Sequence, residues 1–232
     1  MTIARLCALA ALGAVLVQCA PAPAPPPAPA STPQAPHPPA PAPAPSVQPA
    51  AVEPVTAADL GATWHAGCPL PPEQLRRVDL DYWGFDGRTH RGELVVNEDL
   101  TAEVITVFEQ LYQLRYPIEK MQTPDHYPGA EDELSMRDNN TSAFNCRGIP
   151  GTDNWSLHAY GHAVDLNPLI NPYIDSRGEH QPANAGPWLD RSRTDPGVLH
   201  DGDPVVRAFT ARGWRWGGHW RTPLDYQHFE HD

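Results

Sequence analysis

Lysine is almost absent from this chain of 232 residues, and its scarcity excludes several classes of enzyme. Lys120 is the only lysine, so the chain has no phosphate-binding G-x-x-x-x-G-K-[ST] loop. A serine peptidase of the S-x-x-K type is excluded as well, because Pro117 stands three residues before that lysine. A G-x-S-x-G nucleophile elbow is also missing. Serine-based acyl transfer is therefore disfavoured.

Long apolar runs are missing after the first twenty residues, which excludes a later membrane span. Proline, in contrast, is in excess, and 15 of the 29 prolines lie between Ala20 and Pro54. This stretch is almost only Pro and Ala, a composition that cannot form a core and favours an extended spacer. Residues 20–54 are therefore predicted to be a linker. Residues 55–232 remain as one domain, large enough to bury a core.

Residues 1–19 have the pattern of a secretory signal. Arg5 precedes an apolar run from Leu6 to Val17, which is too short for a stable membrane span. Cys19 lies where bacterial lipoproteins carry their lipidated cysteine, although Gln18 replaces the small residue expected before it. Lipidation of Cys19, which would anchor the protein to a membrane, and ordinary cleavage nearby both stay open. In either case we expect export to the cell envelope.

The predicted domain keeps two cysteines, Cys68 and Cys146. Two cysteines in an oxidising compartment most often pair, and closing so long a loop contributes roughly 4 kcal/mol in the chain-entropy model. The alternative is that Cys146 is a thiolate nucleophile with a histidine partner, as in secreted cysteine peptidases. The disulfide is the favoured interpretation.

Negative charge is concentrated on the predicted domain. The formal net charge is −12, and Arg5 and Glu53 cancel within the first 54 residues. A domain this acidic repels the phosphates of nucleic acids and anionic lipid head groups. We therefore expect no nucleic-acid partner, and we expect a monomer.

Hydrophobic periodicity predicts mixed elements rather than a regular βαβ alternation. One helix is expected from Thr101, as N-cap, to Arg115, and another from the N-cap Asp203 to Gly213. Short strands are expected at Gly92–Asn97, Ala163–Asn167, Trp214–Gly217 and Tyr226–Phe229. The chain from Met121 to Trp155 is polar and irregular, as are many loops that line sites.

Side chains with metal-binding chemistry are concentrated in two segments. Residues 156–168 contain His158, His162 and Asp165, and residues 225–230 contain Asp225 and His228. Two imidazoles and a carboxylate suit zinc, and three protein ligands leave a fourth position open for water, as in catalytic zinc sites. A carboxylate three residues before a ligand could then accept a proton from that water.

A zincin helix with the motif H-E-x-x-H does not fit His158 and His162. Ala159 stands where that motif requires Glu, and Gly161 would lie in the middle of the helix. The sequence after Gly161 instead favours a turn followed by a strand.

Taken in order, these motifs resemble the M15 zinc peptidases, which include D-alanyl-D-alanine carboxypeptidases and dipeptidases and phage L-alanyl-D-glutamate endolysins. The resemblance rests on S-x-H-x-x-G-x-A-x-D at 156–165 and on D-x-x-H-F-E at 225–230, and it covers roughly residues 90–231. Further similar stretches are Tyr116–Met121, Asn140–Arg147, Asn167–Pro172 and Gly213–Gly218. The implied fold is α+β, with a small central antiparallel sheet and flanking helices, as in the M15 and hedgehog-like peptidases.

The resemblance also implies roles for individual residues. His158, Asp165 and His228 would be the ligands of Zn²⁺, and Asp225 the general base that activates a zinc-bound water. Arg147 would stabilise the oxyanion, with Arg137 and Arg115 as rivals for that role. The implied function is that of a secreted zinc metallopeptidase that cuts amide bonds in the stem peptides of peptidoglycan, as a carboxypeptidase or an endopeptidase. A zinc-containing module that binds wall peptide without cutting it remains the alternative, and a cysteine endopeptidase using Cys146 is disfavoured.

Several nearby residues have weaker predictions. Ser156 is expected to orient the turn or a ligand, and Glu230 either supports a ligand or is a solvated acid. His162 is expected at the rim or surface, and His219 as an ordinary satisfied histidine, with contact to substrate as the alternative. The tryptophans at 214, 216 and 220 are expected in the core or in the wall of a cleft.

Overall fold

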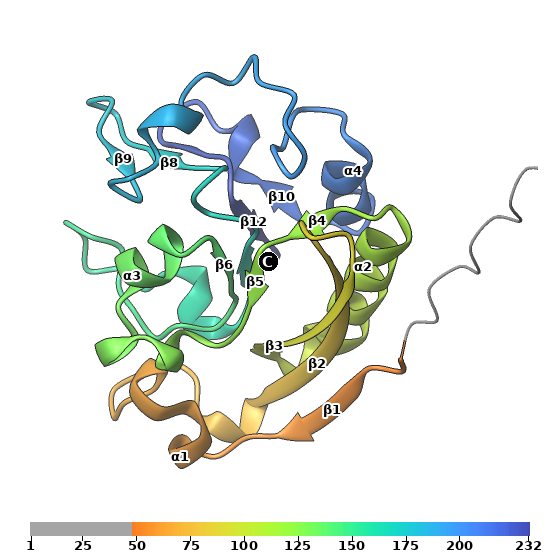
Figure 1. Ribbon diagram of the computed structural model, residues 1–232. Helices are drawn as coiled ribbons and strands as arrows, with labels where there is room; N and C mark the ends of the chain where they lie inside the picture. The colour runs from red at the N-terminus through yellow and green to blue at the C-terminus, as the bar shows by residue number, and fades with distance from the viewer. Residues whose placement is uncertain (1–47) are drawn as a thin grey trace, which may run out of the picture. The chain divides into compact units, whose positions relative to one another are not determined.

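The computed structural model describes residues 48–232, where several small β-sheets are combined with four α-helices (Figure 1). The predicted signal and most of the predicted linker lie outside these residues. None of the helices in this part of the chain is long and apolar enough to cross a membrane. The described residues are α+β, as predicted.

The helices are α1 (Ala57–Leu60), α2 (Thr101–Gln113), α3 (Asp132–Arg137) and α4 (Pro204–Thr210). The strands are β1 (Ala51–Pro54), β2 (Leu75–Gly84), β3 (Thr89–Asn97), β4 (Pro117–Ile118), β5 (Lys120–Met121), β6 (Asn140–Thr141), β7 (Ala163–Asp165), β8 (Tyr173–Ile174), β9 (His180–Gln181), β10 (Arg215–Trp216), β11 (Leu224–Asp225) and β12 (His228–Glu230). Two 3₁₀ turns also matter for the site, η3 (Glu98–Leu100) and η6 (Leu157–Tyr160).

The largest sheet is built on the long hairpin of β2 and β3. Side chains alternate between the two faces of a strand, and on β2 this places Val78, Leu80 and Tyr82 on the core side. Helix α2 buries the face that carries Val104 and Phe108 in the same core. In Figure 1, α2 lies alongside the curved hairpin. The predicted helix and the predicted strand at Gly92–Asn97 are thus both present.

The prediction that Thr101 is the N-cap of α2 is wrong, because the capping residue lies about one turn earlier in the chain. Thr101 is already the first residue of the helix, and its hydroxyl donates to the carbonyl oxygen of Asn97. The capping side chain is that of Asn97, which accepts from the backbone N–H of Asp99 at the start of η3. A 3₁₀ turn therefore precedes the helix, and the cap moves to the start of that turn.

The end of the predicted linker belongs to the folded part. Ala51–Pro54 form β1, which pairs antiparallel with β2, with Ala51 opposite Asp79. Because proline lacks a backbone donor, it is tolerated at such an edge, and β1 is the edge strand of this sheet. The boundary predicted at residue 54 is therefore placed too late.

A second sheet, in the order β10-β12-β7, is antiparallel and carries residues from both predicted motifs. Behind it, Phe229 of β12 stacks on Phe209 of α4, with ring centroids 4.0 Å apart. Since neighbouring residues of a strand point to opposite faces, burying Phe229 turns His228 and Glu230 to the other face. The packing of α4 thus fixes which side of β12 presents its polar residues.

The segment between Met121 and Trp155 is more ordered than predicted. It contains α3 and β6, and β6 pairs in parallel with β5. Residues 139–146 are continuously buried. The prediction of an irregular loop is therefore wrong for this part, because elements of two to six residues are too short to show a periodicity.

Candidate functional site

Strand pairing brings the two motifs together. In the register of β7 and β12, Asp165 lies directly opposite His228. Residues opposite each other in antiparallel strands have Cβ atoms about 5 Å apart, so their side chains meet on the same face. His158 reaches the same place from η6, the turn that precedes β7. All three residues predicted as metal ligands are buried.

The ligand atoms of these three side chains converge on one point. Each offers one atom, and these atoms lie within 4.8 Å of one another. Nε2 of His158 is 3.1 Å from Oδ2 of Asp165, and Nδ1 of His228 is 3.0 Å from Oδ1 of the same carboxylate. The two imidazole nitrogens are 3.2 Å apart.

The outer nitrogens of both rings have acceptors that fix their tautomers. Nδ1 of His158 donates to the carbonyl oxygen of Ala143, at 2.5 Å. Nε2 of His228 donates to the carboxylate of Glu230, at 3.2 Å. A carbonyl or an ionised carboxylate can only accept, so in the neutral rings the inner nitrogens carry lone pairs. When both rings are neutral, the buried centre is lined by lone pairs alone, and this set of ligand atoms fits a cation such as zinc.

The charge balance supports the same conclusion. Burial alone would raise the pKa of the Asp165 carboxyl, but the imidazoles of His158 and His228 hold it well below its usual range. Burial alone would lower the pKa of His228, yet its bonds to Asp165 and Glu230 raise it to about 10. Without a metal ion, a proton on His228 supplies the positive charge that the centre requires.

Gly161 makes the connection between His158 and Asp165 possible. It caps η6 in the left-handed conformation, with φ at +67°, which favours glycine. A Cβ added there would lie 2.4 Å from the backbone nitrogen of Asn97, so the chain also passes too close to the end of β3 for any side chain. The turn predicted in place of a zincin helix is confirmed.

Asp225 lies beside the cluster and is almost fully buried. Its Oδ1 atom has no hydrogen-bond partner. Burial raises the pKa of Asp225 to about 7, and the charge of Asp165 adds to this rise, whereas His228 and Arg147 oppose it. A buried carboxyl with a free oxygen and a pKa near neutrality has the properties of a general base.

Arg147 is the one of the three candidate arginines that lies in the field of these carboxylates. Burial alone would lower the pKa of its guanidinium, but Asp132, Asp165 and Asp225 raise it. It pairs with Asp132, Nη2 to Oδ2, at 2.9 Å. The rivals lie elsewhere, since Arg115 stacks on the ring of Trp83 and Arg137 is exposed at the end of α3.

The residues with weaker predictions fall into distinct places. The Ser156 hydroxyl caps η6 by accepting from the N–H of His158, so it orients the turn as expected. His162 is half-buried and outside the cluster, and the exposed His219 pairs with Asp201. Trp214 and Trp216 are in the core, whereas the half-buried Trp220 lies with its ring centroid 5.4 Å from that of His228.

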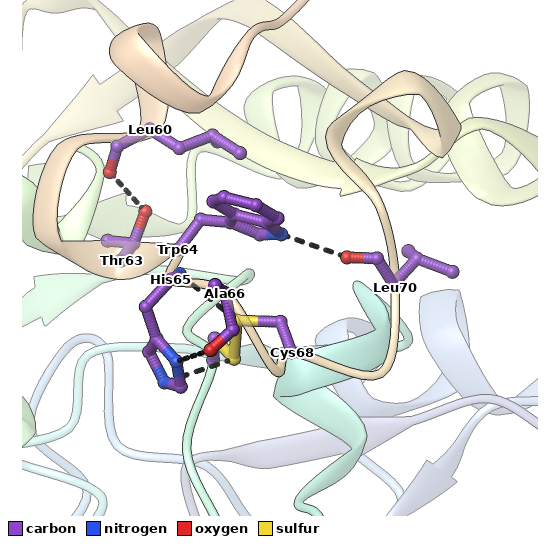
Figure 2. The surroundings of a disulfide bond; sticks show 8 residues. Leu60, Thr63, Trp64, His65, Ala66, Cys68 and Leu70 are labelled. Carbon is purple, nitrogen blue, oxygen red and sulfur yellow. Dashed lines mark hydrogen bonds between the residues drawn. A yellow bond between two sulfur atoms is a disulfide. The ribbon is translucent and has the colours of Figure 1, made fainter.

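A disulfide joins Cys68 to Cys146, and Figure 2 shows its surroundings. The favoured pairing is thus confirmed, and the hypothesis of a free thiolate at Cys146 is wrong. His65 lies beside the bridge, with its Nε2 atom 3.5 Å from Sγ of Cys146. Together these three residues form a second group with metal-binding atoms, but both sulfurs are engaged in the disulfide.

Sequence reasoning missed three contributors to the site. The Ala143 carbonyl orients His158 and has no sequence signal, because any residue supplies a carbonyl. Asp132, which holds Arg147, precedes it by fifteen residues in a segment predicted to be irregular. Gln227, between Asp225 and His228, is buried and bonds to the sulfur of Met136. The sequence gives one signal for Gln227, which is its position inside the motif D-x-x-H.

Comparison with known proteins agrees with this geometry. Residues 150–231 match a family model described as D-alanyl-D-alanine carboxypeptidase. The matched range contains the cluster and Asp225, and it begins just after Arg147. No curated protein and no solved structure matches the chain. The match supports a peptidase, and it confirms that residues 150–231 of this chain are related to the M15 family of peptidases.

Proposed function

We propose that the protein is a zinc metallopeptidase that hydrolyses amide bonds in the stem peptides of peptidoglycan. The observation that carries the proposal is the buried centre formed by His158, Asp165 and His228, which presents only acceptors and has a free carboxylate oxygen of Asp225 beside it. The family match over the same residues supports a peptidase. Zinc bound there would polarise the scissile carbonyl and lower the pKa of a water molecule.

The side chains of this protein would share the remaining work. Asp225 would accept the proton of the attacking water and pass it to the leaving amine, because its Oδ1 atom is free and burial holds its pKa near 7. The guanidinium of Arg147 would stabilise the negative charge that develops on the carbonyl oxygen. Glu230 would keep His228 in the tautomer that binds a metal.

The place of action is part of the same proposal. We propose export through residues 1–19 and anchoring at Cys19, with the prolines of the linker holding the enzyme away from the membrane. Both peptidase types found in the family remain candidates. A D-alanyl-D-alanine carboxypeptidase would release one terminal residue, whereas an L-alanyl-D-glutamate endopeptidase would release the stem from its glycan side.

Digestion of purified muropeptides followed by mass spectrometry tests this function. With zinc, we expect cleavage products whose masses identify the bond, and a chelator should abolish them. The Asp225→Asn variant should lose about 10²- to 10⁴-fold in kcat while binding zinc as tightly as the wild type. The matched control is Asp81→Asn, which changes a buried carboxylate on β2 that pairs with Arg91.

Two results would contradict the proposal. Wild-type turnover in the Asp225→Asn variant would remove that residue from the role of base. Zinc-dependent binding of muropeptides by the wild type without any cleavage would instead favour the wall-binding module.

A further inference from the structure

Asp132 forms an ion pair with Arg147, and the proposed chemistry assigns Asp132 itself no role. Asp132 is the first residue of α3, and its carboxylate holds Nη2 of Arg147 at 2.9 Å. Both side chains are partly exposed, at 24% and 31%. Nε of Arg147, in contrast, is buried and has no hydrogen-bond partner. The guanidinium is thus held through Nη2, while its buried Nε–H remains unpaired.

The guanidinium has three carboxylates within its electrostatic reach, which are those of Asp132, Asp165 and Asp225. Asp165 is engaged by the two imidazoles of the cluster. Asp225 is different, because its buried Oδ1 atom has no partner. If the bond to Asp132 were lost, Asp225 would be the carboxylate left unpaired among these three, and a charge-assisted bond to Arg147 would satisfy a buried donor and a buried acceptor together.

Such a pairing would remove two functions at once. A carboxylate bonded to a guanidinium is a poor base, because the bond stabilises its ionised form. An arginine bonded to that carboxylate cannot also donate to the carbonyl oxygen of a substrate. Given the peptidase function proposed for the site, we infer that Asp132 is a positioning residue that holds Arg147 apart from Asp225, so that the base and the oxyanion donor stay separate.

Steady-state kinetics on a muropeptide that the wild type cleaves tests this role. Asp132→Asn should lower kcat by about 100-fold and leave KM within a factor of about two, because misplacement of a donor by about 1 Å has an effect of this size. Asp132→Glu, which keeps the charge, should recover part of the loss. The matched control is Asp195→Asn, which breaks the pair of Asp195 with Arg193 and should leave kcat unchanged.

A double-mutant cycle separates positioning from a general structural role. If Asp132 acts through Arg147, then Asp132→Asn should cause no further loss of kcat in an Arg147→Ala background. Losses that simply add up in the double variant would overturn the inference. So would a wild-type kcat in the Asp132→Asn variant.

A crystal structure of zinc-loaded Asp132→Asn gives a readout that does not depend on turnover. We expect the guanidinium of Arg147 to bond to the carboxylate of Asp225, and an unmoved guanidinium would overturn the inference. If the wild type cleaves no muropeptide, the proposed function fails, and this structure still decides whether Asp132 keeps the two side chains apart.

Discussion

Zinc should stabilise this protein against unfolding through the buried cluster, and the effect can be measured without knowledge of the substrate. With neutral rings, His158, Asp165 and His228 present only lone pairs to the centre, whereas without a metal a proton on His228 supplies the positive charge. Zinc would replace that proton and bind three ligands at once. A ligand that binds only the folded state raises the free energy of unfolding.

The expected size follows from linkage. At a free zinc concentration 100 times the dissociation constant, the free energy of unfolding rises by about 2.7 kcal/mol. A domain of the size of residues 48–232 has an unfolding entropy of about 0.4 kcal/mol per kelvin at its melting temperature. Zinc should therefore raise Tm by about 7 °C.

Differential scanning calorimetry of chelator-treated protein, titrated with zinc at constant pH, measures this shift. Asp165→Asn should abolish the shift, because it removes the carboxylate that bonds both imidazoles. Glu230→Gln should preserve the shift but require about 10 to 100 times more zinc, because it loses the charged partner of His228. His219→Gln, at an exposed histidine outside the cluster, should behave as the wild type. An undiminished shift in Asp165→Asn would refute the assignment of the cluster as the zinc site.

Two further predictions concern stability. Replacing Cys68 and Cys146 by serine should lower the free energy of unfolding by about 4.5 kcal/mol, because the disulfide closes a loop with a sequence separation of 78. Urea denaturation of the wild type and the double variant measures this difference, and equal free energies of unfolding would contradict the prediction. In chelated protein, burial opposes the rise in the pKa of His228, but its bonds to Asp165 and Glu230 prevail and raise the pKa from 6.5 to about 10. The resulting stabilisation is complete below pH 6.5 and is lost as the pH rises through about 10. Without zinc, the free energy of unfolding measured by urea denaturation should therefore fall over this pH range. The same dependence on pH with and without zinc would contradict this prediction.

The elements that the sequence predicted well are those with strong local signals. The helix α2 shows apolar residues at helical spacing, and α4 is preceded by Asp203 at the N-cap position and has Pro204 at its first position. The shorter elements were missed, as with β6, because two residues carry no periodicity. The predicted cap at Thr101 failed because a 3₁₀ turn intervenes, and turns of this kind have no distinct pattern.

The sequence predicts which side chains form the candidate site, but not the groups that hold these side chains in place. The motifs around His158 and His228 identify the side chains, and the resemblance to a known family gives their order. Alternation along β12 also places Glu230 on the same face as His228. The carbonyl of Ala143 and the ion pair of Asp132 with Arg147 leave no such pattern, because they depend on contacts between segments that are not adjacent in the sequence.

The sequence by itself determined which side chains the candidate site contains: two imidazoles and two carboxylates in short motifs, a glycine where the turn must be left-handed, and two cysteines able to pair. Only the tertiary structure decided that Asp165 faces His228 across β7 and β12, and that Arg147 is held by Asp132 of α3. The physical reason is that side-chain type and alternation are local properties, whereas strand register and ion pairing are decided by the packing of the whole domain.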